Sequence, residues 1–106
     1  MGFFAIADQP EREPIAGFVG RFSSGATMTS VSWNIAAGAL LPEHAHPHEQ
    51  VAHVLSGEFE LTIGGETQRL GPGMVAFVPP NVTHSGRALT ECRIIDVFHP
   101  VRDDYR

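Results

Sequence analysis

Nine residues near the middle of the chain, PEHAHPHEQ at positions 42–50, contain an unusual number of side chains that bind metals. Three of the six histidines of the chain, His44, His46 and His48, lie here, and the run ends in Gln50. Residues two apart on a strand share a face, so His44 and His46 are predicted to point the same way. Two neutral imidazoles placed in this manner can coordinate one divalent ion when further donors come from another part of the fold.

The predicted further donor is His84, which follows the segment VPPNVT. A strand is expected to end at this segment, because proline cannot donate to a central ladder, and the loop after it is expected to turn inward. A histidine-rich loop in solvent that binds nothing is the alternative, and the residues alone leave it open.

The C-terminal run IIDVFHPVRDDYR, residues 94–106, holds a second group of reactive side chains. Asp96 and Phe98 share a face of a predicted strand, and Arg102 follows after a proline bend. Burial among apolar neighbours would raise the pKa of Asp96 and suit it to acid or base catalysis, and Arg102 can fork onto a substrate carboxylate. The residues leave open the alternative of a core phenylalanine, a carboxylate in water and a solvated tail.

These side chains must be positioned by short strands. Eleven Gly and eight Pro divide the chain into pieces too short for helices of normal length, and Gly64-Gly65 between EFELTI and ETQRL is a hairpin signal. The pattern predicts an all-β sandwich or barrel, in which alternate side chains of several strands converge inside. The segments expected to form strands are 31–38, 51–57, 58–65 and 92–98, with a further short apolar strand within GPGMVAFVPPN.

At 106 residues the chain is expected to form one domain, with an arm or edge strand over residues 1–15 and the barrel and tail over residues 16–106. A net charge of −5 without a basic run argues against nucleic acid as a partner, and no apolar run is long enough to span a bilayer. No secretory signal is apparent, and the single Cys92 fits the reducing cytoplasm. All seven basic residues are arginine, which excludes Schiff-base chemistry on a lysine.

Two motifs of the chain are Gly38-x5-His44-x-His46-x3-Gln50-x6-Gly57 and Gly73-x5-Pro79-Pro80-Asn81-x2-His84. They resemble the two signatures of the cupin superfamily. The resemblance implies a jelly-roll barrel, the double-stranded β-helix, around one divalent transition metal, whose identity among Zn, Ni, Fe, Mn and Cu stays open. In this resemblance the metal ligands are His44, His46, Gln50 and His84. Gln50 departs from the usual Glu of the first signature, and Asn81 stands where the second often has Gly.

A glutamine in place of a glutamate makes the predicted site more positive by about one charge. Neutral ligands leave the charge of a divalent ion uncompensated, which favours anionic or carbonyl ligands and lowers the pKa of a bound hydroxyl. Gln50 is therefore predicted to tune the site for Lewis-acid chemistry on a carboxylate-bearing or hydroxylated substrate. The alternative is that Gln50 only fills the space of the nearly isosteric Glu.

Residues 15–106 also resemble a narrower family, the KdgF-type cupins of bacterial pectin and alginate degradation, through HPHEQVAHVLSGEFELTIGGE, PPNVTHS and DVFHPVRDDY. That resemblance implies a metal held by three His and one Gln, and ring opening of 4,5-unsaturated monouronates to linear 5-keto-4-deoxyuronates. It implies that Asp96, Phe98 and Arg102 are the catalytic residues. It also implies a homodimer with an exchanged N-terminal strand. His99 stands where the family commonly has Ser, which weakens the substrate assignment more than the fold.

Two other functions remain open for such a chain. A cupin barrel can capture a small anion or sugar without catalysis, and a histidine-rich site with open positions can hold Fe(II) for dioxygenase chemistry. Oxygen consumption would separate the dioxygenase from a metal-dependent isomerase or lyase.

Overall fold

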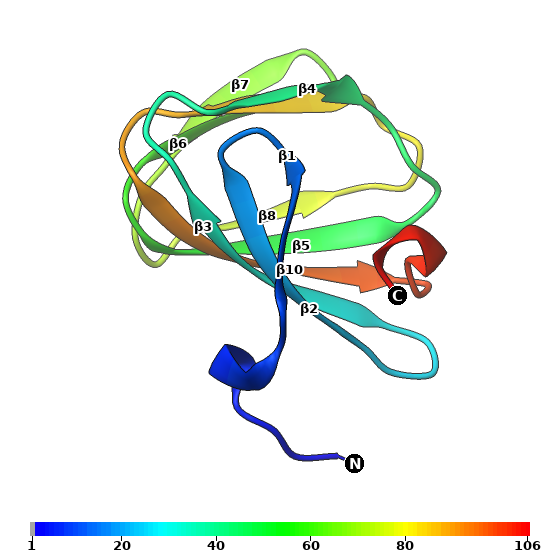
Figure 1. Ribbon diagram of the computed structural model, residues 1–106. Helices are drawn as coiled ribbons and strands as arrows, with labels where there is room; N and C mark the ends of the chain where they lie inside the picture. Colours follow the sequence, from blue (N-terminus) through cyan, green and yellow to red (C-terminus); the bar gives the residue numbers. More distant parts are fainter. Residues whose placement is uncertain (1) are drawn as a thin grey trace.

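The computed structural model describes residues 2–106, which form ten strands in two antiparallel sheets packed face to face (Figure 1). Two 3₁₀ helices, η1 and η2, flank the strands, and none of the helices within these residues is long and apolar enough to cross a membrane. The elements are η1 Ile6–Asp8, β1 Glu11–Ile15, β2 Phe18–Ser24, β3 Thr29–Ile35, β4 Leu40–His44, β5 Glu49–Ser56, β6 Phe59–Ile63, β7 Glu66–Leu70, β8 Val75–Val78, β9 His84–Ala88, β10 Cys92–His99 and η2 Asp103–Tyr105.

The larger sheet has the order β1-β2-β3-β10-β5-β8 and the smaller one the order β4-β9-β6-β7. From β3 to β10 the chain crosses from one sheet to the other at every connection except the hairpin between β6 and β7. This alternation gives the jelly roll that the resemblance implied, and the predicted all-β class is confirmed. Because most consecutive strands from β3 onward lie in opposite sheets, residues close in sequence reach the interior from both sides.

The interior is filled by the alternate side chains of the strands. In β3 the residues Val31, Trp33 and Ile35 are buried, and Ile94 and Phe98 of β10 face the same core. Removing these apolar surfaces from water supplies the main stabilisation, roughly 1.5 to 3 kcal/mol for each fully buried large side chain. At one end of the barrel this apolar filling gives way to the polar residues of the predicted site.

The hairpin predicted at Gly64-Gly65 joins β6 to β7. Both glycines have positive φ, 55° and 87°, as a two-residue turn of type I′ requires. β8 ends at Val78, directly before Pro79, which confirms the predicted proline stop. Residues 11–15 form the edge strand β1, whereas the chain before them lies outside both sheets and Met1 lies outside the described residues.

One expectation is wrong: His44 and His46 do not share a strand. His44 ends β4 in the smaller sheet, His46 lies in the connecting loop, and Gln50 belongs to β5 in the larger sheet. Pro47 lies in this loop, where it cannot donate a ladder hydrogen bond, and the chain changes sheet there. The three side chains therefore converge from two layers and a loop rather than from one face.

Gly57, the last residue of the first motif, gives a stability prediction. Its φ is +81°, and a Cβ there would overlap the carbonyl oxygen of Glu91 and lie 2.8 Å from the Cα of Cys92. We expect Gly57→Ala to lower the free energy of unfolding by about 2 to 4 kcal/mol in urea titrations, from strain plus overlap. Gly71→Ala is the control: its Cβ would meet no described atom within 4 Å, and its stability should stay within about 0.5 kcal/mol of the parent.

Candidate metal centre

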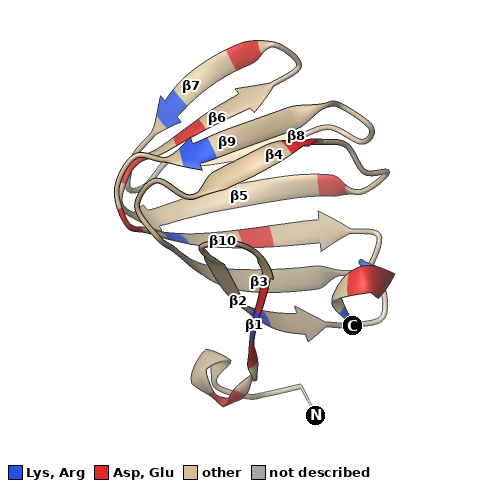
Figure 2. Cartoon of the chain, turned by 45° about the horizontal axis from the view of Figure 1, so that its top comes forward, with Lys and Arg blue, Asp and Glu red and all other residues tan. Residues whose placement is uncertain are grey.

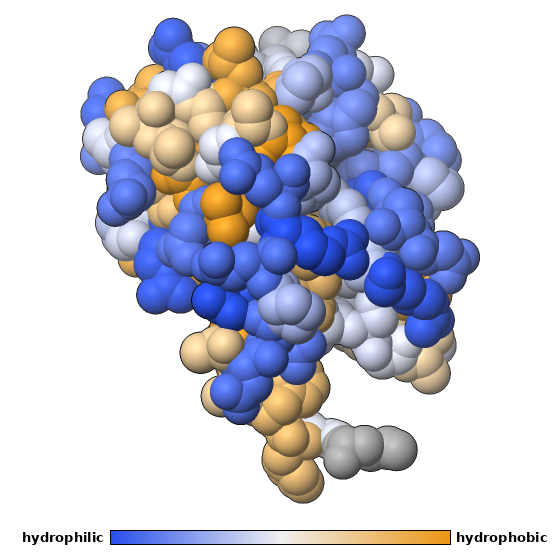
Figure 3. Space-filling view, in the orientation of Figure 1, coloured by the Kyte–Doolittle hydropathy of each residue, from blue (hydrophilic) through white to orange (hydrophobic). Residues whose placement is uncertain are grey.

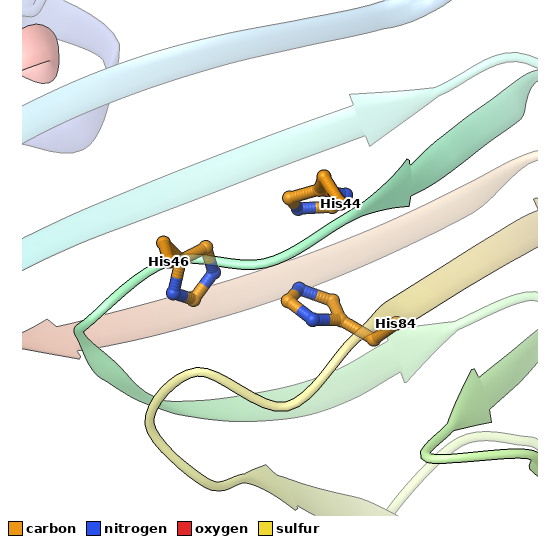
Figure 4. Close-up of side chains that lie close together, drawn as sticks. All are labelled: His44, His46 and His84. Atoms are coloured by element: carbon orange, nitrogen blue, oxygen red, sulfur yellow. The ribbon is translucent and has the colours of Figure 1, made fainter.

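Three histidines meet at one end of the barrel. His44 comes from the end of β4, His46 from the loop that follows, and His84 from the start of β9 (Figure 4). His44 and His84 are direct partners in the β4–β9 pairing, so the smaller sheet itself sets their spacing. One ring nitrogen from each of the three lies within 4.8 Å of the others, a spacing that suits ligands of one ion.

The three rings are oriented by the backbone in the same way. In each ring Nδ1 donates to a carbonyl oxygen two residues away in the chain, which leaves Nε2 as the nitrogen with a lone pair. Such hydrogen bonds fix the tautomer and the direction of a ligating imidazole. The distances are 2.8 Å from His44 to Pro42, 3.1 Å from His46 to His48 and 3.0 Å from His84 to Val82.

Gln50 brings an oxygen to the same point. Its Oε1 lies 3.1 Å from Nε2 of His46. With Nδ1 of His46 donating to the backbone, both of these atoms are acceptors, and a cation between them would satisfy both. Nε2 of His84 is likewise buried without a hydrogen-bond partner within residues 2–106. The donor set therefore fits a divalent transition metal, and the three histidines are compatible with binding one.

Burial keeps two of these imidazoles neutral. Desolvation, followed by the positive charge of Arg102 and the neighbouring His84, lowers the pKa of His46 to about 4. Desolvation is also the main cause of the lowered pKa of His84. Because only the neutral ring has a free lone pair, neither residue must lose a proton to bind a metal at pH 7.

A pocket of about 290 Å³ opens beside the cluster. It is where the residues predicted from the C-terminal run meet those predicted from the middle of the chain. Its walls combine apolar rings with a few polar groups, as small-molecule sites commonly do. The lining includes His44, Gln50 and His84 together with Asp96, Phe98 and Arg102, and also Phe18, Trp33, Leu41 and Tyr105.

Asp96 lies in this pocket and does not face bulk water. Nε1 of Trp33 donates to its Oδ2 at 3.0 Å, and none of the described residues forms a hydrogen bond with its buried Oδ1. Desolvation raises the pKa of Asp96 to about 6, although the Gln50 amide, the Trp33 indole and the charge of Arg102 each lower it. A carboxyl group with this pKa exchanges a proton near neutral pH.

Arg102 reaches the pocket from the chain after the last strand. Its guanidinium carbon lies 4.8 Å from the ring centre of Phe98 and 4.2 Å from that of Tyr105. The Phe98 side chain is 2% exposed, so it belongs to the core and to the pocket wall at once. Arg102 also pairs with Asp104, so the tail is not simply solvated.

Sequence reasoning missed Trp33 and Tyr105. Trp33 is the single tryptophan of the chain, and in β3 it lies on the same buried face as Val31 and Ile35. This alternation is the sequence signal that could have identified it. Tyr105 gives no local signal, because its place depends on contacts with Phe22, Trp33 and Phe98 far away in sequence.

The other histidines lie away from the cluster's centre. His53 and His99 are exposed, and His53 has the opposite parity in β5 to the buried Gln50. His48 is half-buried, its ring centre lies 5.5 Å from that of His46, and its backbone oxygen orients that ring.

Comparison with known proteins agrees with this architecture. The family model described as "Cupin domain" matches residues 31–98. The pectin degradation protein KdgF of Dickeya dadantii (strain 3937) is 36% identical over 74 residues, which are 68% of this chain and 67% of that relative.

Two solved structures resemble nearly the whole chain. An RmlC-like cupin from Shewanella frigidimarina NCIMB 400 superposes with a TM-score of 0.94 at 29% identity, covering 100% of this chain and 96% of that one. KdgF from Halomonas sp. superposes with a TM-score of 0.90 at 29% identity, covering 98% and 97%. The chain therefore belongs to the cupin domain family.

Proposed function

We propose that this pocket opens the ring of a 4,5-unsaturated monouronate to give the linear 5-keto-4-deoxyuronate. The observation that carries the proposal is the buried, unpartnered Oδ1 of Asp96, a residue that lines the same pocket as His44 and His84 of the three-histidine cluster. The similarity to two KdgF proteins, one of them described as a pectin degradation protein, supports uronates as the substrate class.

His44, His46, Gln50 and His84 are the residues that would hold the divalent ion. When bound, such an ion supplies Lewis-acid stabilisation to a developing negative charge on a ligand oxygen. Since none of the four proposed ligands is a carboxylate, they bring no negative charge to the ion and leave its full charge available for an anionic ligand.

Asp96 is assigned the proton transfers. Its carboxylate takes the proton of the anomeric hydroxyl, the bond between the anomeric carbon and the ring oxygen breaks, and an aldehyde and an enolate result. Return of a proton from the Asp96 carboxyl to the carbon of the enolate gives the ketone and restores the carboxylate, so the reaction is an isomerisation without a redox step. A pKa of about 6 allows Asp96 both to accept and to return a proton near neutral pH.

The neighbouring residues position the ligand and the base. Trp33 holds Oδ2 of Asp96 at 3.0 Å, which fixes the direction of Oδ1. Phe98 offers an apolar ring against a sugar face, and Arg102 supplies a cation for the carboxylate. Trp33 and Phe98 belong to the strands β3 and β10, and Arg102 lies in the segment between β10 and η2. Holding the ligand and the base in one geometry in this way favours the reaction.

Product analysis in D₂O tests this function. We expect the metal-loaded protein to convert the unsaturated monouronate into a product of equal composition, with one carbon-bound deuterium by NMR and no oxygen uptake. Oxygen uptake and an oxygenated product would instead identify an Fe(II)-dependent dioxygenase. Stoichiometric binding without any product would identify a binding module.

Gln50→Glu tests whether the charge of the site matters. One additional negative charge at the metal is expected to raise KM for the anionic substrate by about tenfold, because it weakens the attraction of the ion for a carboxylate. Steady-state kinetics at matched metal occupancy measure this. An unchanged KM would mean that the amide only fills its space.

We further propose that two copies of this chain associate. The arm before β1 projects from the body of the molecule with a largely apolar surface (Figure 3). It exposes Phe3, Phe4 and Ile6, at 99%, 55% and 46% of their surface, and the edge strand β8 exposes Phe77 at 63%. A two-fold pair would allow the arm of each copy to cover apolar surface of the other. Light scattering should give twice the chain mass of 11.5 kDa, and Phe3→Ser with Phe4→Ser should give the monomer. A monomeric parent would contradict the proposal.

The proposed setting is the cytoplasm. Cys92 is buried and free, which suits a reducing compartment.

A further inference from the structure

The guanidinium of Arg102 already has a carboxylate partner within its own chain. Its Nε and Nη2 donate to the two carboxylate oxygens of Asp104, at 3.1 and 2.7 Å, so the pair is bidentate. The Arg102 side chain is 11% exposed and that of Asp104 is 57% exposed. Asp104, the partner of the Arg102 guanidinium, therefore lies on the solvent side of the pair. It belongs to the short C-terminal helix η2, where basic and acidic residues adjoin (Figure 2).

Arg102 keeps its place by contacts that do not involve Asp104. Its guanidinium packs against the rings of Phe98 and Tyr105, and its backbone N–H donates to Oγ1 of Thr29 at 3.0 Å. Because these contacts define the position of the guanidinium, a change at Asp104 acts mainly on its charge. The pairing with Arg102 also holds the pKa of Asp104 below its usual range, so this carboxylate is ionised at neutral pH.

We propose that Asp104 is a specificity-determining residue that limits how strongly the pocket prefers an anionic ligand over a neutral one. Its carboxylate offsets the charge of Arg102, so a ligand carboxylate gains less from the pocket than it would from an unpaired arginine. Asp104 engages Nε and Nη2, which leaves Nη1 for the ligand.

This inference rests on the proposed function, in which Arg102 receives the substrate carboxylate. That carboxylate is unchanged by the ring opening, so holding it more tightly stabilises substrate, transition state and product alike. Uniform binding of this kind lowers KM without raising kcat. The Asp104 carboxylate thus limits the affinity of the pocket for both substrate and product. The proton transfers at the reacting atoms are assigned to Asp96.

The test measures binding of galacturonate and galactose to the zinc-loaded protein through the fluorescence of Trp33, the single tryptophan, which lines the pocket. Asp104→Asn keeps one acceptor oxygen and removes the charge. We expect it to lower Kd for galacturonate about two- to fivefold, the range of a partly exposed ion pair, and to leave Kd for galactose unchanged. With the substrate, KM should fall and kcat should not rise.

Asp103→Asn is the matched control. Asp103 adjoins Asp104 in η2, is 87% exposed and pairs with Arg106 at 3.2 Å, so its loss changes the net charge of the tail equally. We expect no change in Kd from this variant. Equal tightening by both variants would show a general charge effect, and weaker galacturonate binding in Asp104→Asn would show a role in positioning; either result overturns the inference.

Arg102→Gln separates this inference from the proposed function. It should weaken galacturonate binding, and adding Asp104→Asn to it should have no further effect. If Arg102→Gln binds galacturonate as the parent does, the carboxylate role of Arg102 fails, and the inference fails with it. If Arg102→Gln weakens binding but Asp104→Asn changes nothing, only the inference about Asp104 fails.

Discussion

Replacing Asp96 with asparagine is expected to lower kcat for ring opening by at least about 10²-fold, the usual contribution of a positioned acid or base. Asparagine keeps the shape of the side chain and an acceptor for the Trp33 indole, whose nitrogen lies 3.0 Å from Oδ2 of Asp96. It cannot take or return a proton. Steady-state kinetics should therefore show a loss in kcat with KM little changed, and a parent-like kcat would remove Asp96 from the mechanism.

The same variant is expected to make the metal-free protein more stable at neutral pH. The pKa of Asp96 rises from 3.8 to about 6 in the fold, because burial disfavours the charged form. Its protonation therefore stabilises the fold fully below pH 3.8, and this contribution is lost as the pH rises through 6. At pH 7.5 the ionised carboxylate costs up to about 3 kcal/mol, which asparagine avoids.

Calorimetry of the metal-free protein checks this sign. The melting temperature of Asp96→Asn should exceed that of the parent at pH 7.5, and the difference should vanish near pH 4. Asp103→Asn, at an exposed carboxylate, should show no such pH-dependent gain. A variant that is less stable than the parent at both pH values would contradict the burial argument.

Removing His84 is expected to have the second large effect, the loss of the metal. Its Nε2 is buried without a partner in the described chain, and its Nδ1 is held by the carbonyl of Val82. Truncation to alanine should weaken metal affinity by at least about 10²-fold, since changes to outer partners of ligands alone cost 10- to 100-fold. Metal analysis after dialysis should fall from about one ion per chain to below about 0.1.

Thermal unfolding gives an independent reading of the same change. A ligand at 100 times its Kd stabilises the folded state by about 2.7 kcal/mol, so added metal should raise the melting temperature of the parent and not that of His84→Ala. His53→Ala is the control, because His53 lies exposed on β5 away from the cluster. Retention of a full equivalent of metal by His84→Ala would contradict the proposed centre.

Much of the fold was predictable because its signals are local. The Gly64-Gly65 turn requires positive φ, and the Pro79-Pro80 pair cannot continue a ladder. At both positions the residue types alone therefore predict the local structure. Strand parity placed Asp96 and Phe98 on one face but left open whether Asp96 points into the barrel or into water. The approach of His44 and Gln50 from two sheets was not predictable from residue spacing, because the chain changes sheet between them.

The parts of the site that sequence did not reveal depend on contacts between distant segments. Trp33 meets Asp96 only because β3 and β10 pair, and Tyr105 reaches the pocket only because the tail folds back over the core. The partnership of Arg102 with Asp104 is close in sequence, yet its meaning depends on where the barrel places Arg102. From the sequence of a short polar tail alone, the residues that line a pocket cannot be distinguished from those that face water.

The most direct measurement follows the absorbance of the conjugated enol of a 4,5-unsaturated monouronate after addition of the purified, metal-loaded protein. The account predicts loss of absorbance far above the buffer rate, abolished in Asp96→Asn and in His84→Ala and retained in His53→Ala. No acceleration over buffer with any of Zn, Ni, Fe, Mn or Cu would contradict it.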